Sequence, residues 1–232
     1  MQLASRQTFW RRGKRLDILP GIYSDGVAYC VLTHVHQNPT KGKVEASVVG
    51  NSAATWQNLQ GKNFFGDSTR DANHLLNNYN TNIPQWSYKS VDIQFYAGTG
   101  IFNARKVPFP ITSPITIIGE RNGNSVHLTL KYKNSGEVLV SKSATTSNQM
   151  TLGRLGIFTQ NNAGAGSGVN PIGGRVPSNH AILDFKYWDG DDLIADLIPC
   201  ADDGGECCFY NSVDGTFVRN IAGSGAFHPY KQ

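Results

Sequence analysis

Residues 181–218, AILDFKYWDGDDLIADLIPCADDGGECCFYNSVDGTFV, hold three of the four cysteines and a run of aspartates. Thiolates bind zinc, carboxylates bind calcium, and two facing thiols can form a disulfide. Aspartate and glycine are also the residues that turns prefer, because the short carboxylate bonds to nearby backbone amides. The segment is therefore either a reactive site or the closing hairpin of a β-domain.

The cysteines do not have the spacing of a structural zinc site. Cys200, Cys207 and Cys208 follow C-x6-C-C, whereas zinc sites pair two short C-x2–4-C or H-x3–5-H elements. His34 and His36 share one side of a predicted strand, which permits a ligand pair, but we interpret this as a chance arrangement. No metal site is predicted. A Cys200–Cys207 or Cys200–Cys208 bridge stays open beside the favoured interpretation, free and partly buried thiols.

The aspartates of this segment lack the ligand order of an EF-hand loop, so we interpret them as turn residues around Gly190, Gly204 and Gly215. No cofactor is predicted, and calcium, although chemically suited to such oxygens, is not supported. The aspartates concerned are Asp189, Asp191, Asp192, Asp202, Asp203 and Asp214.

Short apolar runs must position these residues. With 25 glycines, 10 prolines and 16% charged residues in 232, the chain is rich in turns and globular. In 127–133 the apolar residues alternate with polar ones, as in a half-buried antiparallel strand. Only 55–65 and 71–79 suggest short helical turns, so the fold class is all-β, a two-sheet antiparallel sandwich. The predicted strands are 27–35, 43–50, 89–98, 115–120, 125–133, 137–144, 155–160, 180–190, 192–200 and 215–220.

The N-terminal segment stands apart from this pattern. Residues 1–15 carry five basic residues of a chain whose net charge is +4, so the remainder is about neutral. The remainder therefore lacks the excess of positive charge that is typical of nucleic-acid binding. We predict a basic anchor, 1–15, with Trp10, Arg11 and Arg12 as its contacts; a partly disordered tail is the alternative. Residues 16–232 form one predicted domain.

Targeting signals are absent from the sequence as given. No run of 18 apolar residues exists, so no membrane span is predicted, and residues 1–21 lack the apolar centre of a secretory signal. We therefore expect a protein that is made and folded in a cytoplasm.

One segment has the composition of a glycan platform. Residues 73–90, NHLLNNYNTNIPQWSYKS, combine three aromatic rings with many asparagines. Rings stack on the C–H faces of sugars and amides bond to hydroxyls, so Tyr79, Trp86, Tyr88 and Asn78 are predicted glycan contacts. Loop packing or a subunit contact are the alternatives, and the Gly/Asn loop 160–174 is a second candidate.

Both ends of the predicted domain carry motifs with a specific order and spacing. Residues 19–48 contain SDG-x-x-Y followed by P-x-x-x-K-x-E-like text. Residues 181–227 contain L-x-x-D-x-I-P-C, a Y-x-x-V-x-G-x-F turn and a final N-x-x-G-x-G-x-F. In order and spacing, the two segments resemble the opening and closing segments of concanavalin A-like lectin/glucanase jelly rolls of phage and gut-bacterial proteins. The chain departs from the pattern at Asn211, where Asp commonly follows the Tyr, which weakens a calcium or turn-locking role there. The resemblance implies a concanavalin A-like jelly roll for 16–232.

The resemblance also implies a function. We expect a non-enzymatic phage virion protein, a head fibre, tail fibre or receptor-binding decoration, located in the virion. Its arm would dock on other virion proteins, its lectin-like domain would contact cell-surface or mucin glycans, and it would form a homo-oligomer, with a trimer as the guess. The alternative is a gut-bacterial glycan-binding module or a glycoside hydrolase of the laminarinase-like fold.

Hydrolysis is not expected, because retaining glycosidases need two carboxyl groups about 5 Å apart. Glucanases of the resembling family supply them from E-x-D-x-E on one strand. Here each glutamate lacks a second acidic residue two or four positions later. The glutamates are Glu45, Glu120, Glu137 and Glu206.

Overall fold

The structure is a computed structural model, and it is built of β-strands. Among the described residues there is no helix, and hence none long and apolar enough to cross a membrane. The described residues are 8–11, 13–54, 62–66, 75–78, 90–91, 93–102, 107–108, 111–150, 152–159, 161, 167–170 and 177–231.

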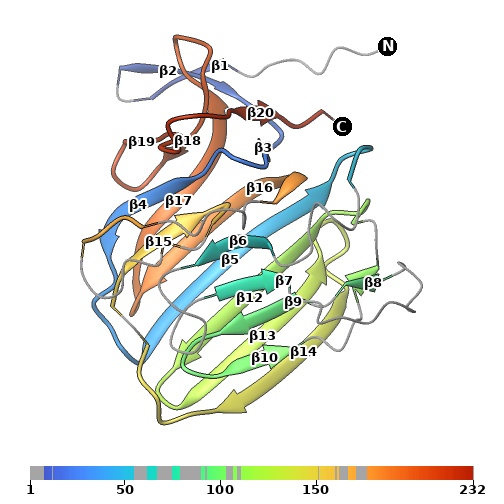
Figure 1. Cartoon of the computed structure of the whole chain (residues 1–232), viewed down its shortest axis with the longest axis vertical. Helices are drawn as coiled ribbons and strands as arrows, with labels where there is room; N and C mark the ends of the chain where they lie inside the picture. The colour runs from blue at the N-terminus through green and yellow to red at the C-terminus, as the bar shows by residue number, and fades with distance from the viewer. Residues whose placement is uncertain are drawn as a thin grey trace.

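The larger sheet is antiparallel throughout, with a main path in the order β1-β2-β17-β16-β5-β12-β13-β14 (Figure 1). Strands β3, β18, β19 and β20 branch from this path. The bounds are β1 Thr8–Arg11, β2 Lys14–Ile18, β3 Ile22–Asp25, β5 Lys41–Gly50, β12 Ile115–Asn122, β13 Ser125–Tyr132, β14 Val138–Thr145, β16 Ser178–Asp189, β17 Asp192–Ala201, β18 Cys207–Asn211, β19 Phe217–Val218 and β20 Phe227–Pro229.

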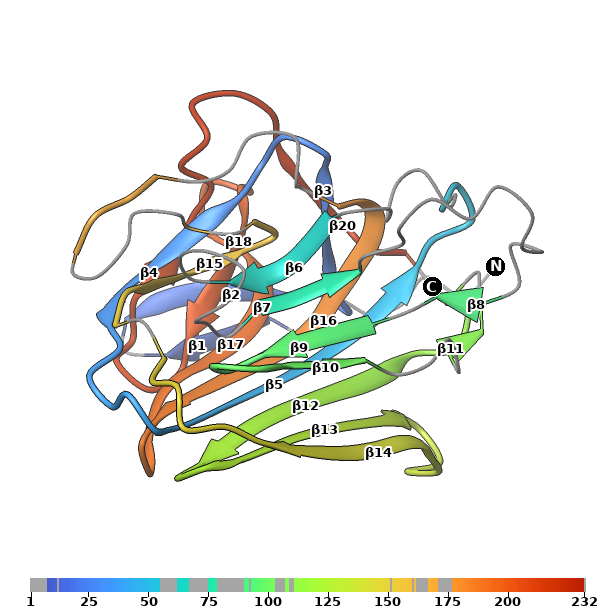
Figure 2. The same ribbon diagram turned by 60° about the horizontal axis from the view of Figure 1, so that its bottom comes forward.

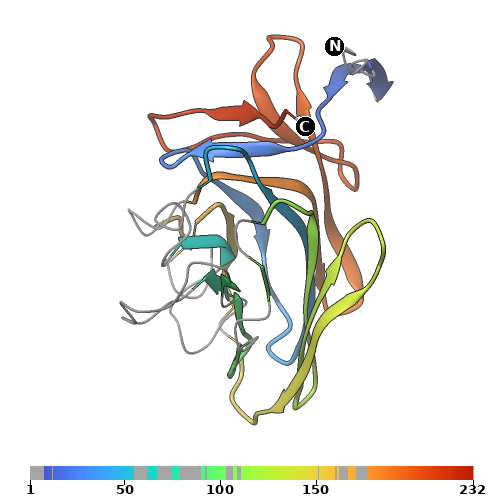
Figure 3. The same cartoon turned by 90° about the vertical axis from the view of Figure 1, so that its right-hand side faces the viewer.

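The smaller sheet lies against it and has the order β10-β9-β7-β6-β15-β4, also antiparallel (Figure 2). Seen edge on, the two sheets form the two layers of a sandwich (Figure 3). The chain passes repeatedly from one sheet to the other, and the predicted two-sheet jelly-roll sandwich is confirmed. The bounds are β4 Cys30–Val35, β6 Lys62–Gly66, β7 Leu75–Asn78, β9 Ile93–Tyr96, β10 Gly100–Phe102 and β15 Arg154–Ile157, with a separate pair β8 Ser90–Val91 and β11 Val107–Pro108.

The core fills the space between the sheets. In β13, Val126, Leu128 and Leu130 are buried while the residues between them are partly or fully exposed, as the alternation predicted. Across the gap, Phe65 of the smaller sheet meets Phe185 of the larger one edge to face, with ring centroids 5.6 Å apart. Each such ring contributes about 2–3 kcal/mol through removal of its surface from water.

One glycine of the larger sheet lets the layers approach closely. The ring of Phe95 in β9 lies over Gly119 in β12, and a Cβ on Gly119 would come within 2.3 Å of a ring carbon. Both Phe95 and Gly119 are buried within the sandwich. A side chain at Gly119 would therefore push the two sheets apart.

The first and last core strands lie side by side. β20 pairs with β3, with His228 opposite Tyr23 in the register. The side chain of Asn220 accepts from the amide of Tyr29, and the amide of Ile221 donates to the Tyr29 carbonyl at 2.9 Å. The closing motif of the sequence is thus bonded directly to the opening one.

A second, smaller core holds the N-terminal hairpin. Leu16, Cys200, Cys208 and Tyr210 form a buried cluster apart from the main core. β2 joins the sheet edge at β17, where Ile18 lies opposite Cys200. The hairpin's second strand runs from 14 to 18, across the predicted domain boundary after residue 15. The domain division itself stays a prediction.

Two local predictions have opposite outcomes. The turn expected between the predicted strands 125–133 and 137–144 is confirmed between β13 and β14, with Gly136 at φ 73° and its amide donating to the Tyr132 carbonyl. The helical turns suggested in 55–65 and 71–79 are wrong where these segments are described, since they contain β6 and β7. Phe64 and Phe65 are both buried, so β6 lacks the alternation that marks a strand.

Candidate functional site

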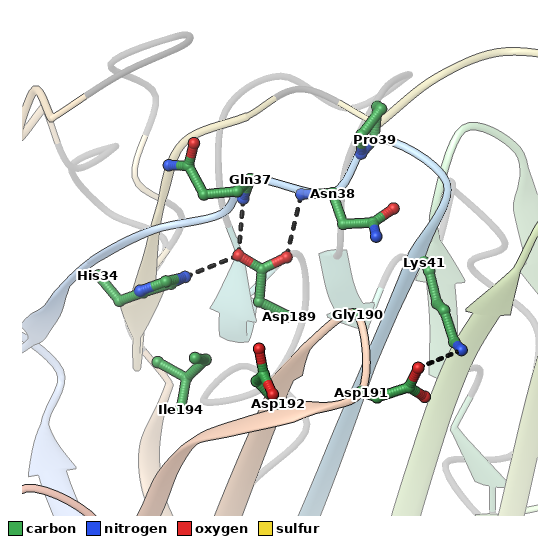
Figure 4. Close-up of a pocket in the computed structure, with 10 residues that line it drawn as sticks. All are labelled: His34, Gln37, Asn38, Pro39, Lys41, Asp189, Gly190, Asp191, Asp192 and Ile194. Atoms are coloured by element: carbon green, nitrogen blue, oxygen red, sulfur yellow. Dashed lines mark hydrogen bonds and ion pairs between the residues drawn. The ribbon is translucent and has the colours of Figure 1, made fainter.

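A polar pocket opens at the end of the sandwich where the β4–β5 loop meets the β16–β17 turn (Figure 4). Residues 37–39 and Lys41 form one wall, residues 189–192 form the other, and His34 and Ile194 lie at the sides. The volume is about 590 Å³, within the range of small-ligand pockets.

Asp189 organises this pocket. His34 Nε2 and the backbone amide of Gln37 each donate to Asp189 Oδ2 at 2.7 Å, and the amide of Asn38 donates to Oδ1 at 3.0 Å. His36 Nδ1 lies 3.1 Å from Oδ1. Both oxygens of the carboxylate thus accept hydrogen bonds, and these bonds connect the β4–β5 loop to the end of β16.

The electrostatics follow from these contacts. Burial by itself raises the pKa of Asp189, but the hydrogen bonds from His34, Gln37 and Asn38 and the electrostatic influence of the nearby His36 ring outweigh it, and the pKa lies below its ordinary value. Asp189 is therefore ionised at neutral pH and acts as a fixed acceptor.

His36 is fully buried behind Asp189. Its Nδ1 lies 2.6 Å from the hydroxyl of Tyr187 as well as near the carboxylate. Burial lowers the pKa of His36, against the opposing effect of Asp189, so the ring is neutral at pH 7.

The groups that face solvent are different ones. Lys41 Nζ contacts the exposed carboxylate of Asp191 at 2.7 Å. Asp192 is exposed and forms no ion pair within the described part of the chain. The side-chain oxygen of Asn38 accepts from the amide of Thr40 at 3.2 Å, which fixes the amide at the pocket wall. These groups offer a ligand both acceptors and donors.

The β16–β17 turn is as tight as the sequence predicted. Asp189 pairs with Asp192 across Gly190 and Asp191, and Gly190 has φ 62°, which favours glycine. A Cβ on Gly190 would lie 3.3 Å from Nδ2 of the Asn38 side chain. The turn and the loop are therefore in close contact.

The histidine pair His34 and His36 does converge, but on a carboxylate. Among the described residues no group of three or more His, Cys, Asp or Glu is arranged to hold a metal ion. The two imidazoles instead help to anchor the β4–β5 loop through Asp189.

The turn interpretation of the acids is confirmed for two of them and corrected for a third. Asp202 accepts from the amides of Gly204 and Glu206, and Asp214 accepts from the amide of Thr216. Asp189, by contrast, bonds to a loop about 150 residues away in the sequence. Local turn chemistry could not show this, because the partner amides come from another strand connection.

Asn211 locks its turn, contrary to the weakening inferred from its departure from the family pattern. Its side-chain oxygen accepts from the amide of Asp196 at 3.0 Å, and its side-chain nitrogen donates to the carbonyl of Ile194 at 3.2 Å. An aspartate would supply the acceptor but not the donor.

The sequence-predicted glycan contacts Tyr79, Trp86 and Tyr88 lie outside the described residues. Asn78 is the last residue of β7 and pairs with Lys62 and Ile93 in the smaller sheet. The structure therefore describes a pocket that sequence reasoning did not single out. The polar loop Gln37-Asn38-Pro39-Thr40 between two strands was the signal that could have drawn attention to it.

The anchor contacts Trp10 and Arg11 belong to β1, which pairs with β2, and the basic arm thus contributes a strand from Thr8 onward. Arg12 and the side chains of Trp10 and Arg11 lie outside the described part. The role of these three residues as an anchor stays a prediction.

No protein-family model matches the chain, and no curated protein matches it. Among solved structures it is similar to a heptameric SAP-like pentraxin from Limulus polyphemus, with TM-score 0.49 and 8% identity over 73% of this chain and 76% of that one. It is also similar to the Ca²⁺/Man-bound exoplasmic/lumenal domain of VIP36, with TM-score 0.39 and 11% identity over 78% and 80%. The Ca²⁺-bound form of that domain gives TM-score 0.39 and 10% identity over 80% and 85%.

Proposed function

We propose that the chain is a non-enzymatic glycan-binding module, carried on a phage virion as a fibre or receptor-binding decoration. The observation that supports glycan binding is the Asp189-centred pocket, an open polar concavity with a rigid wall. The resemblance of residues 19–48 and 181–227 to lectin-like jelly rolls supports the same class.

The pocket has the chemistry that a saccharide requires. Sugar hydroxyls both donate and accept, and Asp192, Asp191 and Lys41 offer acceptors and a donor at the rim. Ile194 and Pro39 supply apolar surface for the C–H face of a ring. Because Asp189 fixes the backbone at Gln37 and Asn38, the pocket wall is preorganised, which lowers the entropic cost of binding.

The same geometry argues against glycoside hydrolysis in this pocket. A general acid at neutral pH needs a raised pKa, and that of Asp189 is lowered by its donors. Asp191 is ion-paired with Lys41. We therefore favour binding without turnover over the laminarinase-like alternative.

A glycan array tests the binding function. The native chain should bind a restricted set of glycans, and Asn38→Ala or Asp192→Ala should weaken that binding at least tenfold. Asp203→Ala, at an exposed position outside the pocket, is the matched control. If Trp86→Ala abolishes binding while the pocket variants do not, the ligand lies on the predicted aromatic platform instead. If no glycan on the array is bound, the proposed glycan-binding function is wrong.

The virion role is tested separately. Mass spectrometry of purified particles should detect the chain, and a shortened chain that begins at residue 16 should no longer be incorporated if the basic arm is the anchor. Detection of the protein only on bacterial envelopes would support the gut-bacterial alternative.

A further inference from the structure

Two buried cysteines face each other across the β17–β18 hairpin. Cys200 and Cys208 are direct partners in the register, and their sulfur atoms are 3.7 Å apart. Both side chains are fully buried in the second core beside Leu16 and Tyr210. The Cys200 thiol also lies 3.6 Å from the carbonyl oxygen of Cys208.

The backbone spacing at this pair fits a disulfide. The amide of Asp202 donates to the Glu206 carbonyl, and the amide of Ser212 donates to the Asp196 carbonyl. Hydrogen-bonded pairs recur at every second position of an antiparallel ladder, so Cys200 and Cys208 form such a pair. Its Cα atoms lie roughly 5.5 Å apart, inside the range that disulfides span.

Cys207 is on the other side of the hairpin. It lies opposite Ala201 in the register and is half-buried against the main core, whereas Cys208 belongs to the second core. Successive side chains of a strand point to opposite faces. Cys207 therefore cannot reach Cys200 without a register shift, which decides between the two bridges that the sequence left open.

We propose that Cys200 and Cys208 are a disulfide-forming pair that a small-molecule disulfide such as oxidised glutathione converts to a cross-strand bridge. One cysteine thiolate attacks a glutathione sulfur and releases one reduced glutathione. The second thiolate then attacks the mixed disulfide at the cysteine sulfur and releases the other. Two thiols and one glutathione disulfide thus become one protein disulfide and two glutathione thiols, with both protons carried by the glutathione.

Burial makes this reaction slow. The hydrogen bond with Cys200 and burial both raise the pKa of Cys208, so little thiolate exists at neutral pH. Oxidation should therefore require local opening of the hairpin and should speed up with pH. Once formed, the bridge would be shielded from reductants by the same second core.

The bridge would fasten the part of the fold that carries the N-terminal hairpin. β17 holds β2 through Ile18 and Asp17 opposite Cys200 and Ala201, and β18 supplies Tyr210 to the same core. A cross-link between β17 and β18 restricts the unfolded chain and should raise the unfolding temperature by about 5 °C.

The experiment is peptide mapping of the purified full chain after incubation with oxidised glutathione. Cleavage at Asp202, Asp203 or Glu206 separates Cys200 from Cys207 and Cys208. The expected product joins the two fragments, with an intact mass lower by two hydrogens, and alkylation after unfolding labels Cys207 and Cys30. Cys207→Ala is the matched control and should still form the bridge, whereas Cys200→Ala and Cys208→Ala should not.

The native chain keeps the test decisive even if a variant fails to fold, because its own peptide map identifies the bridged sulfurs. A bridge that includes Cys207, or full labelling of Cys200 and Cys208 after prolonged oxidation at alkaline pH, would overturn the proposal.

Discussion

The amide of Ala226 donates to the carboxylate of Asp25 at 2.8 Å, although the two residues are 201 positions apart. The same carboxylate accepts from the amides of Val27 and Ala28. Asp25 thus closes the turn that opens the domain and fastens it to the loop before the last strand. The two motifs that suggested a jelly roll from opposite ends of the sequence are one structural unit.

Replacing Asp25 by Ala should lower the free energy of unfolding by about 1–2 kcal/mol, because three backbone amides lose their acceptor and water replaces it only in part. Asp25→Asn keeps one oxygen acceptor and should cost less. Denaturant titration of both variants measures the loss, with Asp203→Ala as an exposed control. Equal stability of Asp25→Ala and the native chain would contradict the role of this carboxylate.

The Asn211→Asp change restores the residue common in the resembling family, yet it should destabilise this chain by about 1–2 kcal/mol. The side chain would lose its donor to the Ile194 carbonyl and place a negative charge against that oxygen. Asn134→Asp, at an exposed turn position, controls for the added charge. Thermal unfolding of the two variants gives the comparison, and a neutral or positive effect at Asn211 would refute the donor's importance.

His180 predicts a specific acid dependence. Burial lowers its pKa to about 4 from 6.5, so it is neutral in the folded state. The free energy of unfolding that depends on the neutral His180 is fully present above pH 6.5. It is lost as the pH falls from 6.5 to about 4, and the total loss over this range is about 3 kcal/mol. His180→Gln should flatten this slope, leaving the share of His36, whose pKa burial also lowers.

The measurement is the unfolding free energy at several pH values between 4 and 7. His127→Gln, at an exposed position of β13, is the matched control for loss of an imidazole. An unchanged slope in His180→Gln would mean that this imidazole is protonated in the folded protein.

Truncation after Pro199 should unfold the domain. Residues 200–232 contain β18 and β20 and supply Phe209 and Phe227 to the main core, where both rings pack against Phe158. Their removal also deprives β3 of its partner β20. Circular dichroism and thermal melting of a chain that ends at residue 199 test this, and a soluble product with a cooperative melt would disprove it.

Much of the fold could be predicted from local pattern. β13 and β17 alternate along most of their length, and the Asp189-Gly190 turn joins β16 to β17 as expected. β6 was not predicted because a strand buried on both faces loses its alternation. β18 was not predicted because its two adjacent cysteines were considered as a candidate reactive site. The pattern therefore identified half-buried strands best.

The pocket could not be predicted in the same way. Its central residue Asp189 has the sequence context of an ordinary turn, and its partners Gln37 and Asn38 contribute backbone amides, which any residue except proline possesses. The side chains of Gln37 and Asn38 therefore carried no signal for these two contacts. Only the register of β16 against β5, with Asp189 opposite Gly42, brings the turn to the loop.

The pairing of β3 with β20 has a consequence for how the molecule can be mounted. Both strands lie at one end of the sandwich together with β2, while the pocket lies at the other end, between the β4–β5 loop and the β16–β17 turn (Figure 1). β1 and β20, the first and last described strands, lie at the same end of the sandwich (Figure 1). If the chain is attached to a surface near these strands, the pocket faces away from that surface.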